Sequence, residues 1–277
     1  MRFGFAYNPT NPGAEAILER AYAWCGAHGF EGWGSPADDR SQIAANCAGS
    51  NLVCVLGGDG TFLHAARGIG DSGVPTLGVN LGRVGFLAKV EIADLERALD
   101  QVASGDFTIE DRFRIAATLI RRNGERDEQA CLNEVVVARG TRVRMIQVEV
   151  EVSGSHLATW VADGVVVATP TGSTAYSFSA GGSILDPRLR NMIITPVAAY
   201  LSALRSVVAG EDHVVRLALR QASSGATISI DGQWDLPMEV GETVEVRALP
   251  APLRMVQLSG STPFYDLLRT KASLLPY

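Results

Sequence analysis

A run of five apolar residues, Leu52–Leu56, leads directly into Gly57-Gly58-Asp59-Gly60, and a helical pattern follows from Thr61 to Arg67. A short, wholly apolar run is typical of a strand buried on both faces, as in a parallel sheet covered by helices. The glycines at the junction allow a tight turn into the helix. This strand–turn–helix arrangement favours an α/β architecture around residue 57.

The rest of the first hundred residues fits the same architecture. Short apolar runs alternate with helix-like stretches, which is the pattern of a parallel sheet with helices on its faces. The expected strands are Arg2–Ala6, Leu52–Leu56 and Pro75–Val79, and the expected helices are Ala14–His28, Thr61–Arg67 and Asp94–Val102. We therefore predict an α/β N-terminal domain over residues 1–108.

The pattern changes near residue 110. In Met145–Val152, apolar and polar residues alternate as they do in a half-buried strand. Further strand-like runs are Ile115–Ile120, Glu134–Ala138, Val165–Ala168, Val214–Leu219, Thr227–Ile230, Thr243–Arg247 and Arg254–Leu258. We predict an all-β sandwich domain over residues 109–260, followed by a helical segment, 261–277, that returns to the first domain.

The composition excludes several classes of protein. The 277 residues carry a net charge of −6 and have a pI of about 5.3, which argues against a nucleic-acid or anionic-membrane binder. No apolar stretch is long enough to span a membrane. The four cysteines form no CxxC pair, which indicates reduced thiols and a cytoplasmic protein. No Gly-Lys-Ser/Thr occurs, so a P-loop nucleotide site is excluded.

The glycine-rich turn at residues 57–60 is suited to binding an anion. Gly57, Gly58 and Gly60 lack Cβ atoms, so peptide N–H groups can face a phosphate at the helix N-terminus. Asp59 would repel that phosphate unless it holds a metal ion or takes a proton. The alternative is that Asp59 is only a helix N-cap and that the glycines only make a tight turn.

A second segment, residues 163–182, is rich in small and hydroxyl residues around one aromatic side chain, Tyr176. Hydroxyls and backbone amides at this density suit the phosphates and ribose of a nucleotide, and Tyr176 could stack on a base. The alternative is a polar loop with a structural tyrosine.

Two shorter motifs are weaker signals. Asn133-Glu134 opens a strand, where the carboxylate could accept the two hydroxyl protons of a ribose. The sequence Ile230-Asp231-Gly232-Gln233 is also that of an ordinary hairpin turn. The histidines show no metal-ligand spacing. Arg67, Arg83 and Arg144 are candidate partners for phosphate charge, or surface arginines.

Together these segments resemble the NAD kinase family. The matching pieces are GGDGTFLHAAR, GVNLGRVGFLAKV, LNEVVVARG, DGVVVATPTGSTAYSFSAGG, IDGQ and FYDLLRTK, which occur in the family's order. The resemblance implies an N-terminal α/β domain of phosphofructokinase-like type and an all-β C-terminal sandwich. It also implies transfer of a phosphoryl group from ATP, or polyphosphate, to the 2′-hydroxyl of the adenosine ribose of NAD, which forms NADP.

The resemblance also implies roles for individual residues. Asp59 would be the catalytic proton acceptor. The residues expected to bind the nucleotides are Gly57, Gly58, Asp59, Gly60, His64, Phe86, Asn133, Glu134, Arg144, Asp163, Thr174, Ala175, Tyr176, Ser179 and Gln233.

The expected reaction needs ATP and NAD as substrates and a divalent metal cation, Mg or Mn, although no protein metal ligands are assigned. Members of the family are typically homodimers or homotetramers in which a neighbouring subunit completes the dinucleotide site. Two alternatives stay open: a non-catalytic dinucleotide-binding sensor, and a lipid or sugar kinase that shares the GGDGT loop.

Overall fold

The apolar run before the glycine turn forms β3 (Leu52–Leu56), a fully buried strand inside a parallel sheet. The computed structural model describes residues 1–82, 85–141 and 144–273. The chain divides into two compact units, one made of Met1–Asp111 with the residues from Leu253 onward, and the other of Arg112–Pro252.

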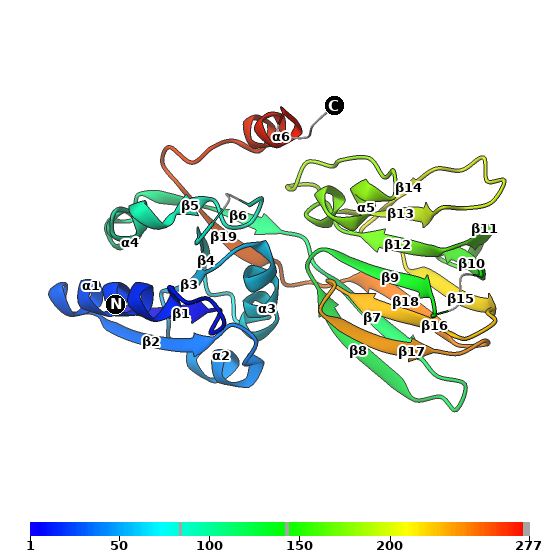
Figure 1. Cartoon of the computed structure of the whole chain (residues 1–277), viewed down its shortest axis with the longest axis horizontal. Helices are drawn as coiled ribbons and strands as arrows, with labels where there is room; N and C mark the ends of the chain where they lie inside the picture. Colours follow the sequence, from blue (N-terminus) through cyan, green and yellow to red (C-terminus); the bar gives the residue numbers. More distant parts are fainter. Residues whose placement is uncertain (83–84, 142–143, 274–277) are drawn as a thin grey trace. The chain divides into compact units, whose positions relative to one another are not determined.

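The first unit is an α/β layer structure (Figure 1). Its sheet has the strand order β2-β1-β3-β4-β19-β6, with β5 paired to β4. Strands β1 to β5 pair in parallel. Its elements are β1 (Arg2–Tyr7), α1 (Ala14–Ala27), β2 (Glu31–Pro36), α2 (Arg40–Cys47), β3, α3 (Asp59–Ile69), β4 (Thr76–Asn80), β5 (Val90–Glu91), η1 (Ile92–Asp94), α4 (Leu95–Ser104), β6 (Phe107–Arg112), β19 (Leu253–Leu258) and α6 (Phe264–Ser273).

Strand β19 corrects the sequence interpretation. The run Arg254–Leu258 was assigned above to the second domain, but β19 pairs in parallel with β4, where Met255 lies opposite Thr76. Its apolar pattern identifies a strand, and nothing in that pattern identifies the partner strand. The chain therefore returns to its first sheet after the whole second unit.

Aromatic and aliphatic side chains fill one face of the first sheet. Trp24 of α1 packs edge-on against Phe3, with ring centroids 5.2 Å apart, and Leu95 and Leu99 of α4 join the same cluster. Gly4 is required because a Cβ there would lie 2.2 Å from the Trp33 ring. Because β1 pairs in parallel with both β2 and β3, the carboxyl ends of the three strands lie along one edge of the sheet.

The second unit is the predicted sandwich of two antiparallel sheets (Figure 1). The strand orders are β11-β10-β15-β18-β7-β8 and β14-β13-β12-β9-β16-β17. The elements are β7 (Ile115–Ile120), β8 (Arg126–Cys131), β9 (Glu134–Arg139), β10 (Ile146–Val152), β11 (Ser155–Ala162), β12 (Gly164–Ala168), η2 (Gly172–Thr174), α5 (Tyr176–Ser179), β13 (Asn191–Val197), β14 (Val207–Gly210), β15 (Val215–Gln221), β16 (Ala226–Ile230), β17 (Trp234–Met238) and β18 (Thr243–Ala248).

The alternating residues of both sheets face inward and form one core. Val148 and Val150 of β10 lie in it with Val165 and Val167 of β12. The α/β and all-β fold class predicted from sequence is therefore confirmed. No helix within the described ranges is long and apolar enough to cross a membrane.

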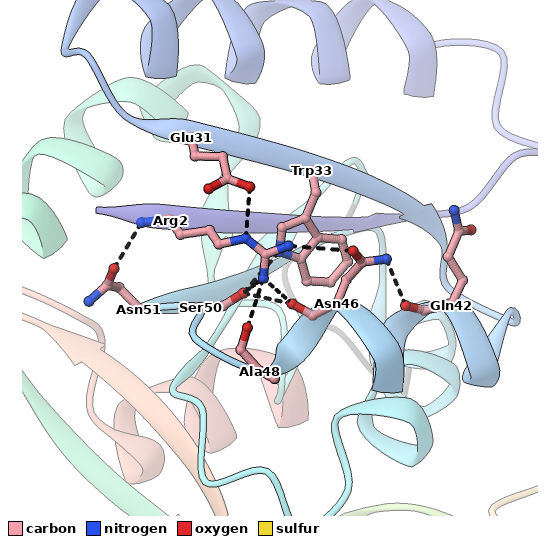
Figure 2. A network of polar contacts seen from close by, with 8 residues as sticks. All are labelled: Arg2, Glu31, Trp33, Gln42, Asn46, Ala48, Ser50 and Asn51. Carbon is pink, nitrogen blue, oxygen red and sulfur yellow. Dashed lines mark hydrogen bonds and ion pairs between the residues drawn. The ribbon is translucent and has the colours of Figure 1, made fainter.

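A polar network ties the amino end of β1 to helix α2 (Figure 2). The Arg2 guanidinium donates to the carbonyl oxygens of Asn46 and Ala48 at the end of α2, and its Nε donates to Glu31 at 3.0 Å. A cation at a helix C-terminus satisfies free carbonyls and complements the helix dipole. Ser50 Oγ accepts from Arg2 and from Trp33 Nε1, which adds the loop before β3 to the network.

We predict that Arg2→Met destabilises the first unit by about 1–3 kcal/mol, because hydrogen bonds to a charged group are lost while the carbonyls stay partly buried. Thermal unfolding measures the effect. The matched control is Arg220→Met, which removes an exposed pair with Glu149 and should change stability by less than about 1 kcal/mol. Equal effects of the two substitutions would contradict the role given to the Arg2 network.

Candidate active site

The glycine turn joins β3 to α3 with open backbone at its tip. Gly57 N donates to Val79 O at 2.9 Å, and a Cβ on Gly57 would lie 2.4 Å from Thr61 Oγ1. Cβ atoms on Gly58 and Gly60 would meet nothing within 4 Å. Gly57 therefore serves packing, whereas Gly58 and Gly60 leave space at the N-terminus of α3 where an anion can approach.

Asp59 is not the helix N-cap, so that alternative is wrong. Gly58 occupies the N-cap position of α3, and no side chain caps it. The Asp59 carboxylate instead accepts from three successive backbone N–H groups, those of Phe86 (2.8 Å), Leu87 (3.0 Å) and Ala88 (3.1 Å). A Cβ on Gly85 would lie 1.8 Å from Asp59 Oδ1. The carboxylate thus holds the segment 85–88 beside the glycine turn.

A pocket of about 340 Å³ opens at the N-terminus of α3. His64, one of the residues expected from sequence, lines it with Gly58 and Gly60. Asn8, Pro9, Ala37 and Asp38 complete the lining together with Thr61. Sequence reasoning missed Asn8, Pro9, Ala37 and Asp38, although they follow β1 and β2, whose carboxyl ends share an edge with that of β3.

Phe86 lies under the C-terminal helix of the first unit. Its ring is 6.2 Å from that of Phe264, and Lys271 Nζ lies 5.2 Å from the Phe86 ring centroid, within cation–π range. Arg67 is in the last turn of α3, roughly 12 Å along the helix axis from Asp59. Arg83 lies outside the described residues.

In the second unit, Asn133 and Glu134 begin β9 beside the turn between β16 and β17. Asp231 Oδ1 accepts from Asn133 N at 2.7 Å and from Glu134 N at 3.1 Å, and its Oδ2 accepts from Leu132 N at 3.0 Å. Asp231 N donates in return to Glu134 O. The hairpin-turn interpretation of Asp231-Gly232 is therefore right, and Gln233 follows the turn at the same end of the sandwich.

The hydroxyl-rich segment after β12 packs on the same residues. Thr169 N donates to Asn133 O at 2.8 Å, and Thr169 Oγ1 donates to Leu132 O at 2.6 Å. A Cβ on Gly172 would lie 2.1 Å from Asn133 O, so only glycine fits there. Thr174 is the last residue of η2, and Ala175 follows it directly.

The side chains of Tyr176 and Ser179 are both exposed. Tyr176 is 44% accessible, and Ser179 ends the short helix α5. Ser177 between them is buried, with its Oγ 3.4 Å from Thr195 Oγ1. The segment is therefore anchored through Ser177 and presents Tyr176 outward, which agrees with a stacking role and does not test it.

Buried side-chain oxygen atoms that accept no hydrogen bond lie at this end of the sandwich. Within the described residues, Asn133 Oδ1 and Glu134 Oε2 accept no hydrogen bond. Glu134 is 6% exposed, and its burial, with a smaller effect from the charge of Asp231, raises its pKa to about 8. Orphaned buried polar atoms are uncommon in folded proteins and mark positions where a ligand, an ion or a water can bind.

Asp163 and Arg144 lie at the opposite end of the sandwich. Glu134 pairs with Ala168 and Ala138 pairs with Gly164, so Asp163 lies beside Arg139, about 17 Å along β9 from Glu134. Asp163 accepts from Arg139 Nε at 2.8 Å. Arg144 is exposed before β10, whose Ile146 pairs with Ala162 next to Asp163. One copy of the sandwich does not bring these two residues to Glu134.

No cluster of three or more His, Cys, Asp or Glu side chains suited to a metal ion is found among the described residues.

We predict that Glu134→Gln stabilises the ligand-free protein increasingly as the pH rises. The Glu134 pKa is raised from 4.5 to about 8 in the folded protein. Between these two pH values the carboxyl ionises in the unfolded chain but stays protonated in the folded protein, so the wild type loses stability as the pH rises. Glutamine has no such titration. Thermal unfolding at several pH values measures the difference, with the exposed turn variant Glu125→Gln as control. A difference independent of pH would contradict the prediction.

Comparison with known proteins identifies the family to which both parts of the chain belong. Residues 18–107 match the family model of the ATP-NAD kinase N-terminal domain, and residues 132–258 match that of the ATP-NAD kinase C-terminal domain. A curated NAD kinase of Heliobacterium modesticaldum is 43% identical over 221 residues, covering 80% of this chain and 78% of the relative. The NAD kinase of Syntrophotalea carbinolica is 33% identical over 281 residues, covering 98% and 97%.

Two solved structures share the fold. Yeast NADH kinase complexed with NADH aligns with a TM-score of 0.81 at 23% identity, covering 99% of this chain and 87% of that one. An NAD kinase from Archaeoglobus fulgidus in complex with ATP aligns with a TM-score of 0.81 at 22% identity, covering all of both chains. With both domain models matched and relatives above 30% identity across most of its length, this chain belongs to the NAD kinase family.

Proposed function

We propose that the protein transfers a phosphoryl group from ATP to the 2′-hydroxyl of the adenosine ribose of NAD, forming NADP and ADP. The observation that carries this proposal is the intact glycine turn in a member of the NAD kinase family. Gly58 and Gly60 leave the backbone open, and a carboxylate is fixed between them. Phosphoryl transfer needs positioning and charge stabilisation more than covalent chemistry from the protein.

The phosphates of ATP would bind at the N-terminus of α3, in the pocket lined by Gly58, Gly60 and His64. Backbone N–H groups and the helix dipole favour negative charge there. A divalent cation, Mg²⁺ or Mn²⁺, would enter bound to the nucleotide phosphates, since such ions are commonly held by few protein ligands and several phosphate oxygens.

The dinucleotide would bind the orphaned oxygens of the second unit. Glu134 Oε2 and Asn133 Oδ1 are acceptors without partners, and the hydroxyls of a ribose are donors of the matching kind. Tyr176, which is exposed, would stack on a base. Thr174, Ala175, Ser179 and Gln233 would contribute the remaining contacts.

Asp59 would accept the proton of the attacking hydroxyl. The ribose oxygen forms a bond to the γ-phosphorus as the bond to the β-phosphate oxygen breaks, and the hydroxyl proton passes to the carboxylate. A carboxylate offers about four lone-pair sites, and three backbone donors occupy three of them at Asp59. One site, on Oδ2, is left for the proton.

The two alternative functions are not favoured. A non-catalytic sensor would be expected to lack Asp59 or the open glycines, and both are present. A lipid or sugar kinase that shares the GGDGT loop would not be expected to match the ATP-NAD kinase C-terminal domain over residues 132–258.

The proposal is tested by an assay of NADP formation with the purified protein. ATP and inorganic polyphosphate are compared as phosphoryl donors, and NAD and NADH as acceptors. We expect NADP from ATP and NAD in the presence of Mg²⁺. Absence of NADP under all donor and acceptor combinations would overturn the proposed function.

We predict that Asp59→Asn lowers the turnover number by roughly 10²–10⁴, the usual size of a general-base contribution. NAD affinity, measured by calorimetry, should change little, because NAD is held chiefly by Asn133 and Glu134. Asp71→Asn, an exposed change just beyond the other end of α3, is the matched control and should retain activity.

A second variant, Gly85→Ala, is compared with Asp59→Asn in the same experiment. Asparagine places an NH₂ group against one of the N–H donors of residues 86–88, so it also loosens that segment. Gly85→Ala displaces the carboxylate sterically, since its Cβ would lie 1.8 Å from Asp59 Oδ1. If Asp59 only anchors the segment, both variants lose similar activity. If it accepts the proton, Asp59→Asn loses more.

We also propose that the active unit is a homodimer or homotetramer in the cytoplasm. About 17 Å of strand separates Asp163 from Glu134 within one sandwich. The family resemblance assigns both residues to the dinucleotide, and a second subunit that supplied Asp163 would bring it to the Glu134 of its partner. Four buried free cysteines support a reducing compartment. Light scattering of the active protein is expected to give at least a dimer mass, and a fully active monomer would contradict the proposal.

A further inference from the structure

The turn between β16 and β17 buries a carboxylate that holds the backbone beside it. Asp231 is 5% exposed and has a left-handed backbone with φ +52°, followed by Gly232 at φ +63°. Two successive left-handed residues make the tight hairpin turn that matches strand twist. The conformation is unusual for a residue other than glycine, and it directs the side chain back toward the strand beside it.

Four donors converge on this carboxylate. They are the backbone N–H groups of Leu132, Asn133 and Glu134, at 2.7–3.1 Å, and the Cys131 thiol at 3.0 Å. Three of these donors reach Oδ1 and one reaches Oδ2, and the carboxylate is buried among them. Asp59, by contrast, is partly exposed beside the open glycines. Asp231 is therefore equipped to hold backbone and is not equipped to bind substrate or take a proton.

The same backbone is held from its other side. Thr169 donates through both N and Oγ1 to the carbonyls of Asn133 and Leu132, and Gly172 packs directly on Asn133 O. The N–H groups of residues 132–134 thus face Asp231. The carbonyls of Leu132 and Asn133 face Thr169. The backbone of residues 132–134 is fixed on both sides, while Asn133 Oδ1 and Glu134 Oε2 remain unpartnered and buried.

We infer that Asp231 is a positioning residue, which orients Asn133 and Glu134 to accept hydroxyl protons of the ligand and does not itself touch it. The inference rests on the proposed function for the identity of that ligand, NAD. The sequence Asp-Gly serves first as a turn, and its carboxylate then sets the geometry of a neighbouring strand.

The charge of Asp231 gives this role a measurable signature. Burial and, secondarily, the Asp231 charge raise the Glu134 pKa to about 8. The other titratable neighbour is Cys131. Burial raises the pKa of its thiol well above the usual range. On the opposite side, Thr169 and Gly172 are uncharged, and Arg112 reaches that loop through Thr171 at 3.4 Å. An ionised Glu134 accepts two hydroxyl protons, so NAD should bind more tightly as pH rises through this range.

The test is calorimetric titration of NAD into wild type, Asp231→Asn, Glu134→Gln and the control Asp235→Asn, an exposed residue on the same hairpin, between pH 6 and pH 9. For Asp231→Asn we expect affinity at pH 9 to fall roughly tenfold, since one charge-assisted bond is lost. We also expect the midpoint of the pH dependence to move to lower pH. Glu134→Gln should abolish that dependence, and Asp235→Asn should match wild type.

A fall in affinity with an unchanged midpoint, or an unchanged affinity, overturns the inference. If Asp231→Asn does not fold, the inference is tested by hydrogen exchange of the wild-type protein instead. Slow exchange of the amides of residues 132–134 supports the inference, and exchange as fast as in exposed loops overturns it. If the wild type binds NAD but forms no NADP, the proposed function fails while this inference stands.

Discussion

A carboxylate that accepts several consecutive backbone N–H groups is the interaction on which both candidate sites depend. Asp59 holds residues 86–88 in the first unit, and Asp231 holds residues 132–134 in the second. Successive N–H groups that point to one side form a concave anion site. In both units the anion is a side chain of the protein, so a loop with no regular secondary structure gains a fixed shape.

The two carboxylates differ in their exposure. Asp59 is partly exposed beside the open glycines, whereas Asp231 is 5% exposed and enclosed by four donors. The same chemical group therefore serves a reaction in one place and geometry in the other. The exposure of each carboxylate distinguishes the two roles, while the identity of the residue does not.

Much of the architecture could be predicted from sequence because its signals are local. Alternation in Ile146–Val152 and the apolar run Leu52–Leu56 each identify a strand without reference to the rest of the chain. The glycine turn and the pair Asn133-Glu134 likewise lie in short motifs. The pocket residues Asn8 and Asp38 could not be found in this way, because they become neighbours only through the order of parallel strands.

Two further features that sequence alone could not predict also depend on how the strands pair. The role of Asp231 depends on the register of β16 against β9, where Ile230 lies opposite Val135, and an Asp-Gly pair looks the same in any hairpin. The distance between Asp163 and Glu134 follows from the antiparallel pairing of β9 with β12. Short sequence motifs identify residues with suitable side chains. The register between strands determines which of those residues lie next to one another.

The return of β19 to the first sheet has a consequence for biosynthesis. In the order β4-β19-β6, strand β6 has no sheet neighbour other than β19, and the ribosome makes all of Arg112–Pro252 between the two. The second unit has only local and internal pairings, so it can fold while the first is still incomplete. Until β19 emerges, β4 presents part of an open edge to other chains. The order of translation thus means that the sheet of the glycine-turn unit is completed only after the whole second unit has been made.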